Sequence, residues 1–164
     1  LMGWALTAPI SSAAIAIMLG LDGLAAGAAT IGCVAQMMGF AAISYRDNGI
    51  GGFLAIGIGT SMLQVANIIK NPMILIPPTV AGIVLAPIAT VWLKLENNPA
   101  GAGMGTSGFV GQLMTFESMG FSMSVFWSIV ILHFIAPAVI SLIIAEWFRK
   151  KGWIKDGDLK ISYE

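Results

Sequence analysis

The side chains best suited to chemistry in this sequence are neutral amides and hydroxyls within a glycine-rich run. The run covers residues 97–112 and includes the pattern Gly103-x-Gly105-x-x-Gly108. Closely spaced glycines allow tight turns and leave backbone N–H and C=O groups open to a ligand. With its amides and hydroxyls, the run supplies these candidate contacts for a bound molecule: Asn97, Asn98, Gly103, Gly105, Thr106, Ser107 and Gln112.

The chemistry of this run suits an uncharged, polyhydroxylated solute better than an ion. Its glycine spacing also matches a dinucleotide fingerprint, but no predicted strand precedes it and no βαβ unit surrounds it. That match is therefore fortuitous. A structural hairpin, in which the glycines only permit close packing, explains the same residues without any ligand.

Two ionisable residues follow the run, Glu117 and His133. An ionisable side chain in an apolar, membrane-like segment indicates a functional site. His133 precedes Pro137 by four residues, so the proline removes the helical hydrogen bond to the His133 carbonyl. A kinked helix with a free carbonyl beside an imidazole could line a polar cavity. The alternative is a neutral histidine that bonds to a neighbouring helix.

A further polar group has helical spacing. Thr60, Gln64, Asn67 and Asn71 fall at i, i+4, i+7 and i+11, which places them on one face of a helix. In a bilayer such a face must meet water, a solute or another helix. Hydrogen bonding between helices and a polar solute pathway both explain it, and under the second reading Gln64 and Asn67 are candidate solute contacts.

Several other chemistries are excluded by the residue counts. One cysteine and one histidine supply neither a metal cluster nor a nucleophile–base constellation, so we expect no catalytic residue, no metal and no cofactor. Gly32, Gln36 and Gly39 share a helical face, where small residues favour close helix packing. Asp22 stands at a predicted helix start, where it is an N-cap or, alternatively, a buried site carboxylate.

Membrane helices are the elements that must position these residues. The chain has 164 residues, of which 57% are hydrophobic and 10% charged, and its mean hydropathy is +0.89. Nine of the 16 charged residues lie in Glu146–Glu164, which leaves seven for the first 145 residues. Soluble domains carry about 25% charged residues. This composition excludes a soluble enzyme, a nucleic-acid binder and a disordered chain, and it predicts an all-α integral membrane protein.

About 20 apolar residues are needed for a helix to cross the bilayer core. Five segments reach or approach that length, and we expect each to span: Leu1–Leu19, Leu21–Tyr45, Ile50–Ile69, Met73–Leu95 and Phe121–Phe148. The stretch Glu96–Gly120 has only its Glu96 and Glu117 as charges, which predicts a re-entrant hairpin at membrane depth. We divide the chain into a membrane domain at 1–148 and a short tail at 149–164.

Lysines and arginines predict the orientation of the chain, since they gather on the cytoplasmic side. Five of them follow residue 148, so the C-terminus is expected in the cytoplasm. With five spans, six basic residues lie inside and two outside; if Ile50–Ile69 lies flat, the counts become seven and one. Charge favours the flat arrangement, whereas an inverted-repeat transporter needs an odd number of spans in each half. The basic cluster Arg149–Lys151 is expected to contact anionic lipid headgroups.

Several runs of the sequence resemble one known family. They are LGLDGLAAGAAT at 19–30, GTSMLQ at 59–64, NP at 71–72, IPPT at 76–79 and NPAGAGMGTSGFVGQ at 98–112. These runs resemble the PfoR-type enzyme IIC membrane proteins, a branch of the bacterial phosphotransferase system of sugar permeases. The resemblance extends from Leu1 to about Trp153, and the glycine-rich run is its most specific part. Members of the family are longer, which implies that this chain corresponds to their C-terminal half and lacks an N-terminal half.

The resemblance implies a permease in the bacterial cell membrane that takes up a sugar while a partner enzyme IIB, served by enzyme IIA, phosphorylates it. It also implies a homodimer and a sugar site in which Glu117 and His133 contact the sugar. Membrane lipids are the other expected partners, and nucleic acid is not. Two alternatives stay open: a non-transporting membrane regulator or scaffold, and a passive channel for a small polar solute.

Overall fold

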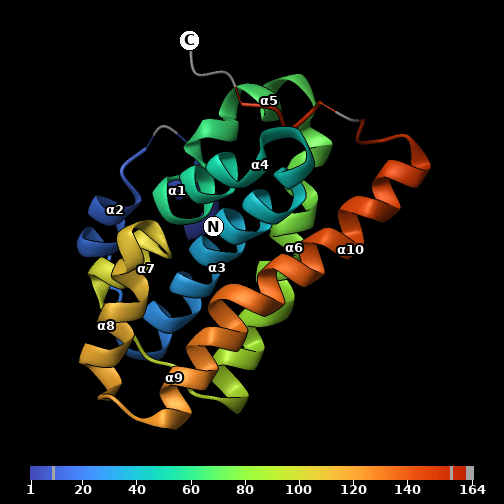
Figure 1. Ribbon diagram of the computed structural model, residues 1–164. Coiled ribbons are helices and arrows are strands. Elements are labelled where there is room, and N and C mark those ends of the chain that lie inside the picture. The colour runs from blue at the N-terminus through green and yellow to red at the C-terminus, as the bar shows by residue number, and fades with distance from the viewer. Residues whose placement is uncertain (9, 156, 162–164) are drawn as a thin grey trace.

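The computed structural model describes residues 1–8, 10–155 and 157–161 (Figure 1). Its first half contains α1 (Met2–Thr7), α2 (Ser12–Met18), α3 (Gly23–Ile43), α4 (Tyr45–Leu54), η1 (Ala55–Gly59), η2 (Ser61–Gln64) and α5 (Val65–Lys70). Its second half contains η3 (Pro72–Leu75), α6 (Ile76–Pro87), η4 (Ile88–Trp92), α7 (Pro99–Met104), η5 (Ser107–Phe109), α8 (Val110–Met119), α9 (Met123–Ile129), η6 (Val130–Ile135) and α10 (Ala136–Lys151). The predicted all-α class is confirmed, and the described residues form no β-strand.

Three continuous helical runs are long and apolar enough to cross a membrane: Gly23–Ile43, Pro72–Trp92 and Met123–Lys151. The first, helix α3, is the centre of the bundle and packs against α1, α6, α7 and α10. In an 18-residue apolar window of α3, 83% is buried inside the protein, whereas the corresponding share is 33% for each of the other two runs. Helix α3 is therefore shielded by protein, while the outer two runs present apolar surface to lipid.

The segment Leu1–Leu19, predicted to span, is not one continuous helix but forms two short helices, α1 and α2. The backbone of Ala8 is extended, with φ −67° and ψ 158°, as expected for a residue that precedes a proline. Pro9 itself lies outside the described residues. Helix α2 then begins afresh at Ser11, whose hydroxyl accepts a hydrogen bond from the Ala14 N–H. Neither helix is long enough to span.

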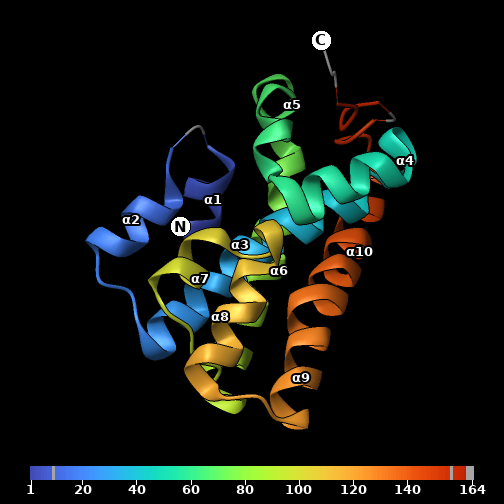
Figure 2. The same ribbon diagram turned by 60° about the vertical axis from the view of Figure 1, so that its left-hand side comes forward.

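The segment Ile50–Ile69, predicted either to span or to lie flat, is not one continuous helix either. The helical ladder stops at Thr60, whose backbone is extended (φ −158°, ψ 139°) and whose hydroxyl accepts from the Met62 N–H to start η2. Two views place α4 and α5 at the end of the bundle where α10 also ends (Figures 1 and 2). Seven of the eight lysines and arginines lie on elements at that end, and Lys94 follows η4 at the other. This distribution matches the flat arrangement of the segment.

Two of the prolines inside apolar segments, Pro87 and Pro137, coincide with changes of helix type. Pro87 ends α6, and the π-helical turn η4 continues the helix to Trp92. Pro137 lies at the start of α10, directly after the π-helical turn η6 that contains His133. Wider turns of this kind accommodate the missing proline hydrogen bond and are frequent at functional sites.

The segment after α10 folds back onto the bundle. Gly152, with φ 77°, ends the helix, and its N–H donates to the Arg149 carbonyl. Ile154, Leu159 and Ile161 are then buried in a core cluster with residues of α3, η1, η3 and α10. Helix α10 thus passes the predicted boundary at 148 by three residues, and the segment that follows it is packed rather than loose.

Candidate functional site

The stretch Glu96–Gly120 forms a helical hairpin, the part of the prediction that concerns its shape. Helices α7 and α8 lie side by side, joined by a turn that includes η5 (Figure 2). Helix α7 packs against α2 and α3, and α8 contacts α3. Asn98 starts α7, since its side-chain oxygen accepts from the Gly101 N–H while Pro99 occupies the first turn. Gly105 and Gly108 adopt φ +56° and +55°, which allows the reversal between the helices.

Close packing accounts for two of the predicted contact glycines. A Cβ atom on Gly103 would lie 2.4 Å from the Cα of Ala13, and one on Gly105 would lie 2.7 Å from the Cβ of Cys33. The Gly103 carbonyl also accepts a hydrogen bond from the Ser12 hydroxyl. These glycines let the hairpin approach α2 and α3, as the packing interpretation of the run expects.

The base of the hairpin is fixed by Asn97, which is 1% exposed. Its amide nitrogen donates to the Thr30 hydroxyl at 2.9 Å and to the Gly111 carbonyl and Thr115 hydroxyl at 3.0 Å each. Its side-chain oxygen accepts from the backbone N–H of Asn98. Asn97 thereby joins α3, α7 and α8, and its amide nitrogen is fully used within the protein.

The tip of the hairpin is held in the same way. The Thr106 hydroxyl donates to the Gly57 carbonyl, and the Ser107 hydroxyl donates to the Gly59 carbonyl at 2.9 Å. Both acceptors belong to η1, a π-helical turn. The hydroxyls predicted to contact a solute therefore attach the hairpin to the broken α4–α5 segment.

Among the predicted contact residues, Gln112 and His133 form a pair whose hydrogen bonding is incomplete. The Gln112 amide nitrogen lies 2.7 Å from the His133 Nδ1, and it joins α8 to the π-helical turn η6. The two residues are 5% and 2% exposed. The Gln112 side-chain oxygen is buried and has no hydrogen-bond partner among the residues that the structure describes. The pair is therefore both fixed in position and incompletely satisfied, which is unusual for a purely structural contact.

Sequence reasoning placed Glu117, rather than Gln112, together with His133. In the structure Glu117 lies on the exposed side of α8, whereas Gln112 and Thr115 occupy the buried side. A carboxylate on the apolar, buried side of this helix would be costly without a cationic partner. The neutral amide takes that position instead.

Gln64 and Asn67 lie away from the hairpin and contact the segment after α10. The Gln64 amide donates to the Leu159 carbonyl at 2.8 Å, and the Asn67 amide donates to the Lys160 carbonyl at 2.9 Å. Asn71 extends the row by donating to the Trp153 carbonyl at 2.9 Å. Gln64, Asn67 and Asn71 thus share one partner, the tail of the same chain. Thr60, the fourth member of the predicted face, is instead the extended residue that starts η2. Neither a neighbouring membrane helix nor a solute is needed to explain these amides.

Sequence reasoning placed Gln36 on a helical face with Gly32 and Gly39 and gave it no role, but it lines a cavity of about 560 Å³ between α1, α3 and α6. Its amide nitrogen and the Trp4 indole N–H both donate to the Thr79 hydroxyl, at 3.1 and 2.9 Å. The Gln36 side-chain oxygen is buried without a partner in the described part of the chain. The lining is otherwise mostly apolar. No spacing rule pointed to this cavity, because it depends on how α1 crosses α3.

A scan against protein-family models gives one match, to a family described as "Phosphotransferase system, EIIC", over residues 1–161. No curated protein and no solved structure shows significant similarity to the chain.

Proposed function

The chain belongs to the phosphotransferase system EIIC family, and from that premise we propose that it translocates a neutral sugar or related polyol by alternating access. Membership identifies a multi-pass membrane protein that acts as a permease subunit beside EIIA and EIIB proteins. The three apolar helical runs agree with that assignment. The solute class, the contact residues and the movement are the parts proposed here.

The observation that carries the proposal is the Gln112–His133 pair. It offers a sugar an unused carbonyl oxygen and an imidazole held 2.7 Å from the amide nitrogen. A buried acceptor without a donor costs about 1–3 kcal/mol, and a solute hydroxyl would remove that cost. Both groups are neutral hydrogen-bonding groups rather than fixed charges, so they favour a hydroxyl over an ion.

The rest of the predicted contact set supports the pair by holding the hairpin in place. Asn97 fixes its base to α3, while Thr106 and Ser107 fix its tip to η1. His133 lies within the π-helical turn η6, and the tip of the hairpin contacts another such turn, η1. We propose that alternating access moves the hairpin relative to α9–α10 at these turns, which opens the Gln112–His133 contact to one side at a time.

Phosphoryl transfer would be carried out by the EIIB partner on the cytoplasmic side. The end of the bundle formed by α4, α5 and the end of α10 holds seven of the eight basic residues. Positive residues gather on the cytoplasmic side, so we propose that this end and the C-terminus face the cytoplasm. The division proposed from the sequence, a permease domain at 1–148 and a cytoplasmic tail from 149, fits this orientation, with the tail packed on the domain.

Uptake measurements test the proposal directly. Cells or vesicles with the full protein and its EIIA and EIIB partners would be offered radiolabelled hexoses, hexitols and disaccharides, with a sugar phosphate and an amino acid as charged controls. Gln112→Leu and His133→Leu are expected to lower uptake of the accepted neutral solute at least tenfold. The matched control, Glu117→Gln, alters an exposed residue of the same hairpin and is expected to leave uptake unchanged.

Other outcomes would contradict parts of the proposal. Uptake that persists without EIIA and EIIB and without phosphorylation would indicate a passive channel. The absence of uptake and of solute-dependent stabilisation for every neutral probe would indicate a regulator or scaffold. Full activity of both Gln112→Leu and His133→Leu would remove the pair from the solute site.

A further inference from the structure

The cytoplasm-facing end of α10 in the proposed orientation carries a basic cavity that the transport proposal does not use. Its volume is about 460 Å³, and it lies between the start of α4 and the segment after α10. Four of the residues that line it are positively charged and one, Glu146, is a carboxylate. The positive residues are Arg46, Arg149, Lys150 and Lys155. This excess of positive charge favours an anion.

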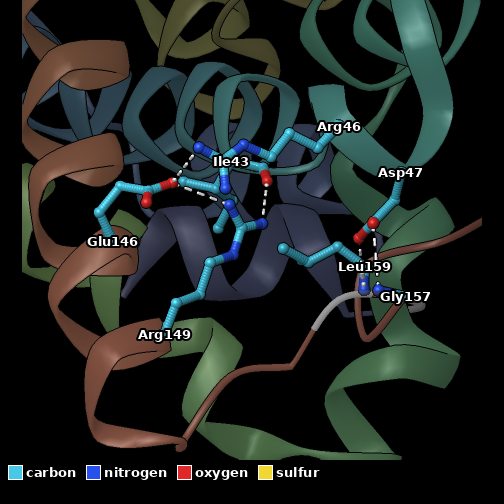
Figure 3. A network of polar contacts seen from close by, with 7 residues as sticks. All are labelled: Ile43, Arg46, Asp47, Glu146, Arg149, Gly157 and Leu159. Atoms are coloured by element: carbon cyan, nitrogen blue, oxygen red, sulfur yellow. Dashed lines mark hydrogen bonds and ion pairs between the residues drawn. The ribbon is translucent and has the colours of Figure 1, made fainter.

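Arg149 is the most deeply placed of these cations, with a side chain 10% exposed (Figure 3). Its Nη1 donates to the Glu146 carboxylate at 2.9 Å, and its Nη2 donates to the Ile43 carbonyl at 3.0 Å. Its Nε is buried and has no acceptor among the described residues. A buried guanidinium N–H without an acceptor is costly, so this group favours an anion that would pair with it.

Glu146 brings a second guanidinium to the same place. Arg46 Nη2 lies 3.3 Å from the carboxylate oxygen that Arg149 also contacts (Figure 3). The carboxylate offsets one positive charge, so the cavity keeps an excess of cations. Guanidinium groups bind phosphate oxygens through several N–H donors in a fixed fork, which makes a phosphate the best-matched anion here.

An apolar cavity of about 670 Å³ adjoins the basic one and shares Arg46, Glu146 and Lys150 with it. Its other lining residues are Leu142, Ile143 and Trp147 of α10, which are 38%, 65% and 53% exposed. A free phosphate or a sugar phosphate has no apolar part that would contact such a surface. A phospholipid has both parts, since its phosphate is followed by acyl chains that favour apolar contact.

We propose that the end of α10 is a binding site for an anionic phospholipid. The phosphate lies among Arg46, Arg149, Lys150 and Lys155, and an acyl chain follows Leu142, Ile143 and Trp147 towards the middle of the bilayer. This is a defined site, in contrast to the diffuse attraction of a basic tail to a charged membrane surface. It depends on the chain being a membrane protein and not on which solute it transports.

Lipid titration of the full chain in detergent, followed by native mass spectrometry, tests the site. The probes are phosphatidylglycerol, phosphatidylcholine with the same acyl chains, and glycerol 3-phosphate as the phosphate without chains. Phosphatidylglycerol is expected to bind at least tenfold more tightly than either of the others. Equal binding of phosphatidylcholine would overturn the proposal, and equal binding of glycerol 3-phosphate would replace the lipid by a soluble anion.

Paired charge variants separate the site from overall charge. Lys150→Gln with Lys155→Gln removes two exposed cations of the cavity and is expected to weaken phosphatidylglycerol binding about tenfold. Lys70→Gln with Lys160→Gln removes two exposed cations outside the cavity lining and is expected to change it less than twofold. Melting temperatures in lipid-free detergent check that both variants fold. Equal weakening by the two pairs would show diffuse attraction and refute the site.

Discussion

At the residue scale, Asn97 is the side chain on which the hairpin depends most directly. Its amide nitrogen contacts three acceptors from α3 and α8 in a fully buried position. A shorter side chain would leave the Thr30 and Thr115 hydroxyls without this donor, while the Gly111 carbonyl keeps the Thr115 hydroxyl. Buried unpaired polar groups cost more than a lost exposed contact.

We therefore expect Asn97→Ala to destabilise the protein by about 2 kcal/mol, as a lower melting temperature in detergent. Asn98→Ala is the matched control, because it removes the contact that starts α7 and a weak contact to the Met114 sulfur, and it should cost about 1 kcal/mol. Equal melting temperatures for the two variants would contradict the role assigned to Asn97.

The glycines of the hairpin give a second test at this scale. A Cβ on Gly103 would lie 2.4 Å from the Ala13 backbone, so Gly103→Ala must displace α2 or α7 and should cost about 1–3 kcal/mol. Gly51 lies in α4, and a Cβ there would meet nothing within 4 Å. Gly51→Ala should be neutral or stabilise by up to about 1 kcal/mol, because alanine favours helix. Thermal unfolding of both variants decides whether close packing explains Gly103.

At the scale of elements, the segment after α10 acts as a strap across the broken α4–α5 region. Asn48 and Gln64 both donate to the Leu159 carbonyl at 2.8 Å, and the Asp47 carboxylate accepts from the N–H groups of Gly157 and Leu159 (Figure 3). These side chains bond to the backbone of the segment. The buried Leu159 side chain completes the contact in the apolar core.

Leu159→Ala is expected to loosen the strap as a unit. Deleting this buried side chain should cost about 3 kcal/mol, and the amides of Gln64 and Asn67 should lose their partners together. Hydrogen exchange over residues 64–71 should rise, while exchange in the middle of α3 stays slow. Lys155→Ala, on the exposed side of the same segment, serves as the control. Unchanged exchange over 64–71 would show that the strap does not hold this region.

The same elements show what the sequence could predict. The apolar length of Gly23–Ile43 was enough to predict α3. The positions of Pro87 and Pro137 were enough to predict an irregular turn in each of the other two long helical runs, because such turns depend on local composition. The spacing of Thr60, Gln64, Asn67 and Asn71 predicted a shared polar face, and all of these residues except Thr60 contact the same segment. That segment lies about 90 residues away in the sequence, and local spacing carries no information about that contact.

At the scale of the whole molecule, composition was sufficient for the membrane class and the helical fold, and the glycine run was sufficient for the hairpin. Composition was not sufficient to predict the number of membrane spans. Leu1–Leu19 and Ile50–Ile69 are apolar enough to span but are interrupted at Ala8 and Thr60. A hydropathy average over a window does not change when one residue is extended. The ladder of helical hydrogen bonds, in contrast, is interrupted by a single extended residue. The Gln112–His133 pair could not be predicted from the sequence either, because it requires α8 and η6 to be adjacent.

Labelling with a membrane-impermeant maleimide distinguishes the three-span arrangement from five spans. Single cysteines would replace Arg46, Lys94 or Lys155 in a Cys33→Ala background, since Cys33 is the one cysteine of the chain. In the structure Arg46 pairs with Glu146 near the end of α10, so Arg46→Cys and Lys155→Cys should be labelled from the same side, and Lys94→Cys from the other. The surface pair lost at Arg46 is worth at most about 1 kcal/mol, so the variant should fold. If Ile50–Ile69 crossed the membrane, Arg46→Cys would be labelled together with Lys94→Cys. In the proposed orientation, intact cells should label only Lys94→Cys, and permeabilised cells should label all three.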